Sequence, residues 1–456
     1  MKVAFHTLGC KVNQYETEAI KEAFVSRGAE IVNEDEAADV YVVNTCTVTN
    51  IADRKSRQYI RRMKSLSPSA LMIVTGCYAQ VAADEIEKMP EVDFIIGNSL
   101  KSEIADKAYE LYTQKSDTER AAPKMHLLGY DELTEYEDMG SVTLAESSMC
   151  RAYIKIEEGC NRFCSYCLIP YARGKVRSRR PEDVVAEASS LIAKGYKEII
   201  LTGINTALYG TEEGFEFERK ADEEDLSGLE TIIKRIDAIE GDFRIRLSSL
   251  EPTVVNVDDV KKLLGYGKLC HHLHLSLQSG SDDVLKAMNR RYNKEEYLEI
   301  VKALRDFDPL YGVTTDIIVG FPGEDEEDFE DSLDVVNKAE FARVHAFRYS
   351  PRKGTRGAEL KKKVPGDISS ERADRLEAAA TETAMKFNKK NFELVHTVLA
   401  EEEQEGYITG YTDNYIRTYI EAGKDGDLKN TPRPGDFCKV KLTENYKDGC
   451  KAVLAE

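Results

Sequence analysis

The sequence predicts an α/β protein in three parts: an N-terminal doubly wound parallel-sheet domain, a central partial (βα)6 barrel and a small C-terminal all-β barrel. In residues 1–98, and again in 149–355, β-branched apolar runs alternate with helical patterns. This order is typical of parallel sheets covered by helices. Residues 395–456 change to short strands separated by turn signals such as Pro434-Gly435-Asp436, a pattern that favours a small barrel.

The first part has four apolar runs that are nearly continuous, which suits strands buried on both faces. Helical patterns separate them. The expected strands are Val3–Leu8, Val40–Asn44, Leu71–Gly76 and Phe94–Gly97, and the expected helices are Gln14–Ser26, Ala52–Ser65 and Ala79–Lys88. Residues 99–148 are polar and acidic, and we expect a linker at Tyr130–Ser148.

The central part holds about six βα units. Its expected strands are Ala152–Glu157, Glu198–Thr202, Arg244–Ser248, His272–Leu277, Thr314–Val319 and Val344–Tyr349, with helices between them such as Pro181–Lys194 and Glu324–Lys338. A parallel barrel carries its chemistry at the carboxyl ends of the strands. A long amphipathic helix at Ser369–Leu394 is expected to lead into the terminal barrel.

Composition narrows the class of protein. The chain has 456 residues, 42% of them hydrophobic, and a net charge of −19 that argues mildly against binding nucleic acid. It shows no apolar run of membrane-spanning length and no signal-peptide pattern, so we expect a cytoplasmic protein, and a monomer. Clustered cysteines are more often metal ligands there than disulfides. Four of the ten cysteines fall in no motif and are expected to be buried or half-buried thiols: Cys150, Cys270, Cys438 and Cys450.

Cys160, Cys164 and Cys167 form a C-x3-C-x2-C motif directly after an expected strand. Three thiolates on one loop can hold three irons of a [4Fe–4S] cluster and leave the fourth iron open. S-adenosylmethionine can chelate that iron through its amino and carboxylate groups, and an electron from the cluster then yields a 5′-deoxyadenosyl radical. The alternative is a structural zinc loop, which would need a fourth ligand that no nearby His or Cys supplies.

Cys10, Cys46 and Cys77 form a second set, about one βα repeat apart, and each directly follows an expected parallel strand. Ligand sites of open α/β sheets lie beyond the carboxyl ends of the strands, so the three thiols are expected to meet at one point. Each thiol alone would be read as an ordinary buried cysteine. Three in the same structural position favour a shared metal, again with one open iron.

The triplet and its place on the first barrel strand resemble the radical S-adenosylmethionine superfamily. Later strand ends match the positions where that family binds its cofactor: Leu201-Thr202-Gly203-Ile204-Asn205, Ser248-Ser249-Leu250-Glu251-Pro252, Ser276-Leu277-Gln278-Ser279-Gly280 and Ile318-Val319-Gly320-Phe321-Pro322. The resemblance implies that S-adenosylmethionine contacts eight of these residues: Gly203, Asn205, Ser248, Glu251, Ser276, Gln278, Ile318 and Gly320.

The whole arrangement resembles the methylthiotransferase family, with the terminal barrel similar to a TRAM domain. The resemblance implies domains at 1–114, 146–377 and 380–456, and two [4Fe–4S] clusters. In the family the auxiliary cluster, here on Cys10, Cys46 and Cys77, carries the transferred sulfur. One S-adenosylmethionine supplies the methyl group and a second supplies the radical. An electron donor such as a flavodoxin or ferredoxin is implied as a partner.

Three family branches differ in substrate: tRNA with threonylcarbamoyladenosine beside the anticodon, at position 37; tRNA with isopentenyladenosine there; and an aspartate of a ribosomal protein. The segments Thr7–Thr17 and Cys167–Arg179 resemble the threonylcarbamoyl branch, which implies methylthiolation at C2 of that adenosine. Basic residues that follow the cysteines also favour an RNA substrate. Five of them are candidates for contacts to RNA phosphates: Arg173, Lys175, Arg177, Arg57 and Arg61.

The composition of residues 391–456 argues against tRNA as the substrate. This segment has 8 Lys and Arg against 13 Asp and Glu, and such an acidic surface would bind a basic ribosomal protein better than RNA. A hypothesis from another class is a non-catalytic, zinc-dependent RNA-binding protein that uses both cysteine sets structurally.

Overall fold

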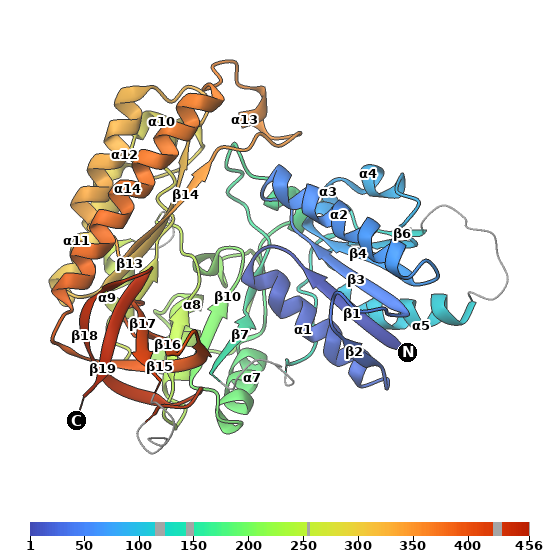
Figure 1. Ribbon diagram of the computed structural model, residues 1–456, viewed down its shortest axis with the longest axis horizontal. Coiled ribbons are helices and arrows are strands. Elements are labelled where there is room, and N and C mark those ends of the chain that lie inside the picture. Colours follow the sequence, from blue (N-terminus) through green and yellow to red (C-terminus); the bar gives the residue numbers. More distant parts are fainter. Residues whose placement is uncertain (115–123, 143–149, 253–255, 423–430, 456) are drawn as a thin grey trace.

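The computed structural model describes residues 1–114, 124–142, 150–252, 256–422 and 431–455. Figure 1 shows three packed parts, with the N-terminal domain and the C-terminal barrel both placed against the central domain. No helix of the described ranges is both long enough and apolar enough to cross a bilayer.

The N-terminal domain is a parallel sheet of six strands in the order β2-β1-β3-β4-β5-β6. The strands are β1 Lys2–Thr7, β2 Glu30–Val32, β3 Val40–Thr45, β4 Leu71–Gly76, β5 Phe94–Ile96 and β6 Lys124–His126. The four expected strands are present. The sequence did not predict β2 and β6, which have three residues each and are too short for a periodic signal.

Helices cover both faces of this sheet, and apolar cores lie under each face. They are α1 Lys11–Val25, α2 Asn50–Leu66, α3 Cys77–Val81, α4 Ala83–Glu87 and α5 Ile104–Gln114. The single helix expected at Ala79–Lys88 is wrong. Two short helices occupy this stretch because the backbone leaves helical geometry at Ala82, with φ −132°.

The central domain is a partial parallel barrel. Its strands are β7 Arg151–Lys155, β10 Glu198–Thr202, β11 Arg244–Leu247, β12 His272–His274, β13 Gly312–Val319 and β14 Arg343–Arg348. They form two three-stranded sheets, β7-β10-β11 and β12-β13-β14. Isolated parallel bridges from Ile245 to Leu269 and from Leu250 to Leu275 join the two. The expected six-stranded order is therefore confirmed, with β7 and β14 at its two ends.

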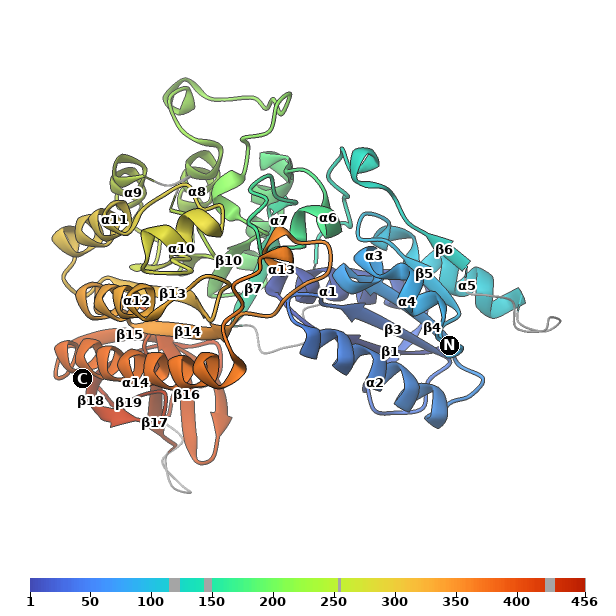
Figure 2. The same ribbon diagram turned by 90° about the horizontal axis from the view of Figure 1, so that it is seen from above.

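Helices of the βα units surround this barrel (Figure 2). They include α6 Ile169–Arg173, α7 Pro181–Ala193, α8 Gly228–Asp237, α9 Val257–Leu263, α10 Asp282–Ala287, α11 Lys294–Phe307, α12 Glu326–Ala339 and α13 Arg356–Glu359. A two-stranded antiparallel ribbon of β8 Glu157–Glu158 and β9 Arg177–Ser178 encloses the loop that carries the cysteine triplet.

The long helix α14 Gly366–Lys390 packs against α12 and β14 and leads into the C-terminal barrel. It ends before the expected Leu394. The barrel is closed in the order β15-β16-β17-β19-β18, which confirms the predicted all-β unit. Its strands are β15 Val395–Gln404, β16 Tyr407–Thr412, β17 Arg417–Glu421, β18 Phe437–Tyr446 and β19 Gly449–Leu454.

A buried charge cluster joins the two barrels at the amino ends of the central strands. Glu198, the first residue of β10, accepts hydrogen bonds from Nε of Arg244 (2.5 Å) and from both Nε and Nη2 of Arg246. The same guanidiniums donate to the backbone oxygens of Tyr411 (3.0 Å) and Thr412 (3.2 Å) in the C-terminal barrel. The C-terminal barrel therefore covers this end of the central barrel and leaves the carboxyl end for the cysteine triplet.

Candidate functional site

The three N-terminal cysteines lie at one edge of the sheet. Cys10 caps α1, Cys46 follows β3, and Cys77 begins α3 directly after β4. Because β1, β3 and β4 are neighbours in the sheet, their carboxyl ends bring these loops together. Gly9 lies so close to Cys46 that an added β-carbon would be 2.9 Å from Sγ. All three thiols are free, as a shared metal site requires.

The cysteine triplet lies on the loop between β8 and α6. The backbone N–H of Ile169 donates to Sγ of Cys167 over 3.4 Å, and Nη1 of Arg290 donates to Sγ of Cys164 over 3.3 Å. The N–H of Cys160 is bonded to the oxygen of Gly174 (3.0 Å). Hydrogen bonds to cysteine sulfur are among the interactions that tune iron–sulfur sites, so this loop fits the cluster that the spacing predicts.

Arg173 connects the two cysteine sets. It ends α6, the helix that follows Cys167, and its Nε donates to Sγ of Cys77 over 3.3 Å. Its Nη1 lies 2.8 Å from carboxylate oxygens of Glu16 in α1 and of Glu158 in β8. All these side chains are fully buried. The N-terminal site and the triplet loop are therefore held together by one guanidinium.

Two lysines complete this buried network. Lys155 of β7 binds both Glu16 (3.0 Å) and Glu158 (2.9 Å), and Lys101 of the N-terminal domain also pairs with Glu16. Burial raises the pKa of Glu16, but the charges of Arg173, Lys101 and Lys155 outweigh it and hold that pKa well below its usual range. The carboxylates and cations compensate one another, as buried ionised groups require.

Cys46 and Cys77 are buried, the three triplet cysteines are half-buried, and Cys10 is exposed as a residue. Burial raises the pKa of the Cys46 and Cys160 thiols to about 12. Burial also raises the pKa of the Cys10 thiol, and the charge of Arg173 opposes that rise. The guanidiniums of Arg173 and Arg290, each within hydrogen-bond distance of a sulfur, are thus the groups here that favour negative sulfur.

Next to the triplet, the ends of β8 and β10 form a buried wall with unpaired acceptors. Oε2 of Glu157 accepts from the N–H groups of Ile204 (2.9 Å) and Asn205 (3.0 Å). Gly203 permits this approach, since a β-carbon there would be 2.6 Å from that oxygen. Among the described residues, Oε1 of Glu157 and Oδ1 of Asn205 are buried without a hydrogen-bond partner. Two unpaired acceptors fit an ammonium group, such as that of S-adenosylmethionine.

Glu251, another expected cofactor residue, joins this wall to the triplet. Its carboxylate accepts from Nδ2 of Asn205 (2.9 Å) and lies 3.3 Å from Nε of Arg162 and 3.6 Å from Nη1 of Arg290. The structure therefore brings Gly203, Asn205 and Glu251 together beside Cys164. Burial raises the pKa of Glu157 well above its usual range, and the two donated N–H groups act against that.

The remaining expected cofactor residues are spread along the strand ends. Ser248 Oγ lies 3.4 Å from Oγ1 of Thr202. The oxygen of Ser276 accepts from Arg290 and from Tyr292. Gln278 and Ile318 pair through their backbones, and the N–H of Gly320 donates to the carboxylate of Glu324 (2.9 Å) in the turn that leads from β13 to α12. The contacts of these five residues with S-adenosylmethionine stay predictions.

Two of the five candidates for RNA contacts are buried in this structure, so their guanidiniums are not presented to solvent. Arg173 is fully buried in the network described above, and Arg177 is buried with its Nη2 donating to the oxygen of Arg173 (2.8 Å). Both guanidiniums turn inward because buried carboxylates of other segments require cations. Lys175 is exposed. Arg57 donates to the hydroxyl of Tyr78, and the exposed Arg61 lies 3.9 Å from Glu91.

Sequence reasoning missed several residues of the site, notably Glu16, Glu157 and Arg290. Glu157 is at the end of an expected strand, next to the triplet, and this position could have identified it as a candidate site residue. Arg290 carries no such signal, because it reaches Cys164 from a loop far along the chain. The four cysteines outside the motifs are buried or half-buried thiols, as predicted.

Comparison with known proteins agrees with this architecture. Residues 154–336 match the model of the radical SAM superfamily, and residues 2–97 match an uncharacterized protein family, UPF0004. A solved structure, the radical S-adenosylmethionine methyltransferase TsrM from Kitasatospora setae, has a TM-score of 0.55 with 15% identity, and the match covers 78% of this chain and 77% of that one. At this identity the likeness concerns the fold.

Curated relatives match over almost the whole chain. The threonylcarbamoyladenosine tRNA methylthiotransferase MtaB of Bacillus subtilis is 39% identical over 93% of this chain and 91% of its own. The protein of that name from Thermotoga maritima is 36% identical over 100% and 98%. A tRNA-2-methylthio-N(6)-dimethylallyladenosine synthase of Caldicellulosiruptor saccharolyticus is 36% identical over 84% and 79%. The chain therefore belongs to the radical S-adenosylmethionine methylthiotransferase family.

Proposed function

We propose that the protein methylthiolates C2 of N6-threonylcarbamoyladenosine at position 37, beside the anticodon of tRNA. The triplet and the N-terminal trio would each hold a [4Fe–4S] cluster. When bound, the first supplies the electron that cleaves S-adenosylmethionine and so starts radical chemistry, and the second supplies the sulfur. Two molecules of S-adenosylmethionine are used, one as methyl donor and one as radical source.

The observation that carries the proposal is the contact of Arg173 with Cys77. It joins a residue of the triplet loop to a ligand of the second site, inside one buried network. Chemistry that generates a radical at one cluster and delivers sulfur from another needs the two sites fixed relative to each other. A zinc-dependent binding module would have no such requirement.

The protein's own side chains have definite tasks in this proposal. Glu157 and Asn205 offer acceptors to the amino group of S-adenosylmethionine. Arg290 and Glu251 hold the wall of that pocket against Cys164. The buried ion network around Arg173 keeps water away from the region between the two cysteine sets.

Exposed aromatic residues near the triplet support RNA as the substrate. The rings of Phe163 and Tyr171 lie 5.8 Å apart, both are exposed, and Tyr130 lies 6.3 Å from Phe163. The ammonium of Lys175 lies 5.8 Å above the ring of Tyr130. Exposed aromatic rings beside a cation are the elements on which single-stranded bases stack. We further propose that the protein works as a monomer with a flavodoxin or ferredoxin as electron donor.

The test is a reaction with purified components. Anaerobically reconstituted protein, S-adenosylmethionine and a reductant are incubated with three substrates in parallel: an anticodon stem-loop with threonylcarbamoyladenosine, the same stem-loop with isopentenyladenosine, and ribosomal proteins. The proposal expects methylthiolation of the first alone, measured by mass spectrometry. Product on either of the others, with none on the first, contradicts it.

A further inference from the structure

Several side chains of the central strands are half-exposed below the strand ends. On β12 and the residues after it, the half-exposed His274, Ser276 and Gln278 alternate with fully buried leucines. On β13 the half-exposed Asp316 and Ile318 alternate with buried Ile317 and Val319. Because alternate residues of a strand point to opposite faces, the polar set lines the interior. Half-exposed polar side chains on this face can contact part of a substrate.

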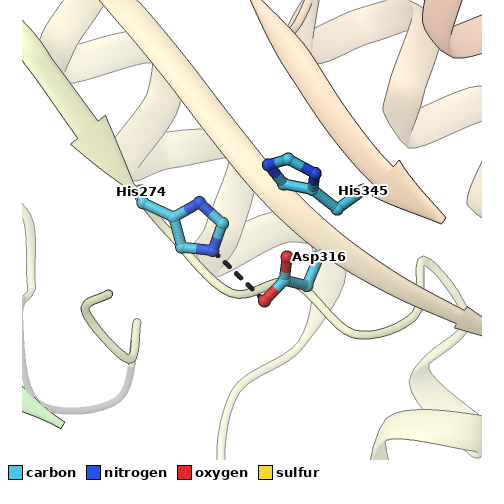
Figure 3. A group of neighbouring side chains, drawn as sticks. All are labelled: His274, Asp316 and His345. Carbon is cyan, nitrogen blue, oxygen red and sulfur yellow. Dashed lines mark ion pairs between the residues drawn. The ribbon is translucent and has the colours of Figure 1, made fainter. Parts of the chain in front are cut away.

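His274 and Asp316 lie beside His345, as Figure 3 shows. His274, Asp316 and His345 come from the neighbouring strands β12, β13 and β14, and each offers one polar atom within 4.8 Å of the others. Nε2 of His274 lies 3.3 Å from Oδ2 of Asp316, while its Nδ1 bonds to Thr314 (3.0 Å). Among the described residues, His345 has no hydrogen-bond partner, so its imidazole is available to a ligand.

Lys11 brings a positive charge to the same interior. It directly follows Cys10 and begins α1, and its ammonium lies 5.7 Å from the ring centre of Tyr153 in β7. Burial lowers the pKa of His345 in β14, and the charge of Lys11 acts in the same direction. In the described parts of the chain no carboxylate lies within ion-pair distance of this ammonium. Lys11 is therefore a half-buried cation with no anion beside it.

The charges around His274, Asp316 and His345 indicate which kind of ligand this group can bind. Two histidines and a carboxylate can bind a divalent metal. Here, however, burial lowers the pKa of His345, and the nearby cations Arg343 and Lys11 lower it further while Asp316 acts in the opposite direction. A divalent cation would add to that positive charge, whereas an anionic ligand would offset it. The surroundings thus favour a carboxylate that carries further polar groups.

We propose that Lys11 and His345 bind the carboxylate of the substrate's threonine group, and that Asp316, with His274 beside it, accepts a hydrogen bond from the threonine hydroxyl. The inference rests on the proposed function and names the residues that select the threonylcarbamoyl substituent. Lys11 is a specificity residue whose position next to Cys10 fixes the substituent relative to the sulfur-delivering site. An ammonium and an imidazole N–H donate to a carboxylate with the strength of charge-assisted hydrogen bonds.

The experiment compares two stem-loop RNAs with the reconstituted protein: one with threonylcarbamoyladenosine, the other with its methyl ester, which lacks the negative charge. The readout is the ratio of kcat/KM for acid and ester within each variant. We expect the unmodified protein to prefer the acid by about 10- to 100-fold, the size of one charge-assisted contact. Lys11→Gln is expected to bring the ratio near 1, and His345→Gln to lower it by about 10-fold. Lys21→Gln, on the same helix but paired with Glu18, should keep the ratio of the unmodified protein.

The remaining outcomes of this experiment would contradict either the inference or the proposed function. If the ratio stays high in both Lys11→Gln and His345→Gln, the inference is overturned. Equal loss on acid and ester in both variants also overturns it, because the residues then serve structure or cluster binding. Stoichiometric zinc, cobalt or iron beyond two clusters that is lost in His345→Gln assigns the place to a metal instead. Failure of the unmodified protein on both RNAs would contradict the proposed function itself.

Discussion

Nε of Arg173 donates a hydrogen bond to Sγ of Cys77 over 3.3 Å, across the boundary between the central and N-terminal domains. The same guanidinium pairs with Glu16 on one side and Glu158 on the other. A fully buried arginine between two carboxylates is a rigid link, because removing one member leaves uncompensated charge. The relative position of the two cysteine sets follows from this link.

Arg173→Gln should therefore destabilise the protein by about 3–5 kcal/mol, as expected when one partner of a buried ion network is removed. It should also lower the iron content of the N-terminal site. Denaturant unfolding and iron analysis of anaerobic preparations measure the two effects. Lys175→Gln, two residues away and exposed, is the matched control and should change neither. A stable Arg173→Gln variant with full iron content would show that the network does not hold the domains together.

Replacement of the N-terminal trio separates the two chemical tasks. The variant with Cys10, Cys46 and Cys77 changed to Ala should keep about four of eight irons and still cleave S-adenosylmethionine, since the triplet is intact. It should form no methylthio product. Release of 5′-deoxyadenosine and mass spectrometry of the RNA are the two assays, and Cys438→Ala serves as the control. Methylthio product from the triple variant would refute the sulfur-delivering role.

Glu157→Gln tests the pocket wall beside the triplet. The amide keeps an acceptor for the N–H groups of Ile204 and Asn205 but cannot take on the negative charge that a bound ammonium would stabilise. Loss of a hydrogen bond between charged groups costs about 1.5–3 kcal/mol, so we expect binding of S-adenosylmethionine to weaken by about 10- to 100-fold. Equilibrium dialysis with the reconstituted protein measures it. Glu213→Gln, at an exposed position, is the control, and equal affinity in the two variants would exclude Glu157 from the cofactor pocket.

The junction of the two barrels predicts a dependence of stability on pH. Burial raises the pKa of Glu198, but the charges of Arg244, Arg246 and Arg151 outweigh it and hold that pKa well below its usual range. A depressed carboxyl pKa stabilises the fold above the unfolded-state value, and this stability is lost as pH falls through the folded-state value. Glu198→Gln should thus be less stable than the unmodified protein at pH 7. The difference should shrink as pH falls below about 4.5.

Chemical denaturation of both proteins between pH 3 and pH 7 gives this difference directly. Glu213→Gln again provides the control, because its side chain is exposed. A difference between Glu198→Gln and the unmodified protein that does not vary with pH would mean that the carboxylate charge is not what joins the barrels.

The parts of the site that sequence could predict are those set by local spacing or by strand order. Cys160, Cys164 and Cys167 lie on one loop, so their spacing alone reveals them. Cys10 and Cys46 were found because each follows a strand of a parallel sheet, and the carboxyl ends of such strands share an edge. The three-part fold followed from the same hydrophobic patterns.

The parts that sequence could not predict depend on long-range pairing. In the sequence, Arg173 looks like one member of a run of basic residues. It is buried because Glu16 and Glu158, which are far apart in the chain, both pair with it. Lys11 and His345 likewise carry no local signal of a shared site, and Lys11 reaches Tyr153 of β7 because α1 packs against that strand. Which cation of a run turns inward is decided by carboxylates from other segments, and no local pattern encodes that.

The most direct measurement of the central claim is nucleoside analysis of tRNA from a strain in which this gene is deleted. We predict that 2-methylthio-N6-threonylcarbamoyladenosine disappears, that N6-threonylcarbamoyladenosine accumulates in its place, and that the gene restores the modified nucleoside while the variant lacking Cys160, Cys164 and Cys167 does not. A profile of methylthio nucleosides identical to that of the parent strain would contradict the account.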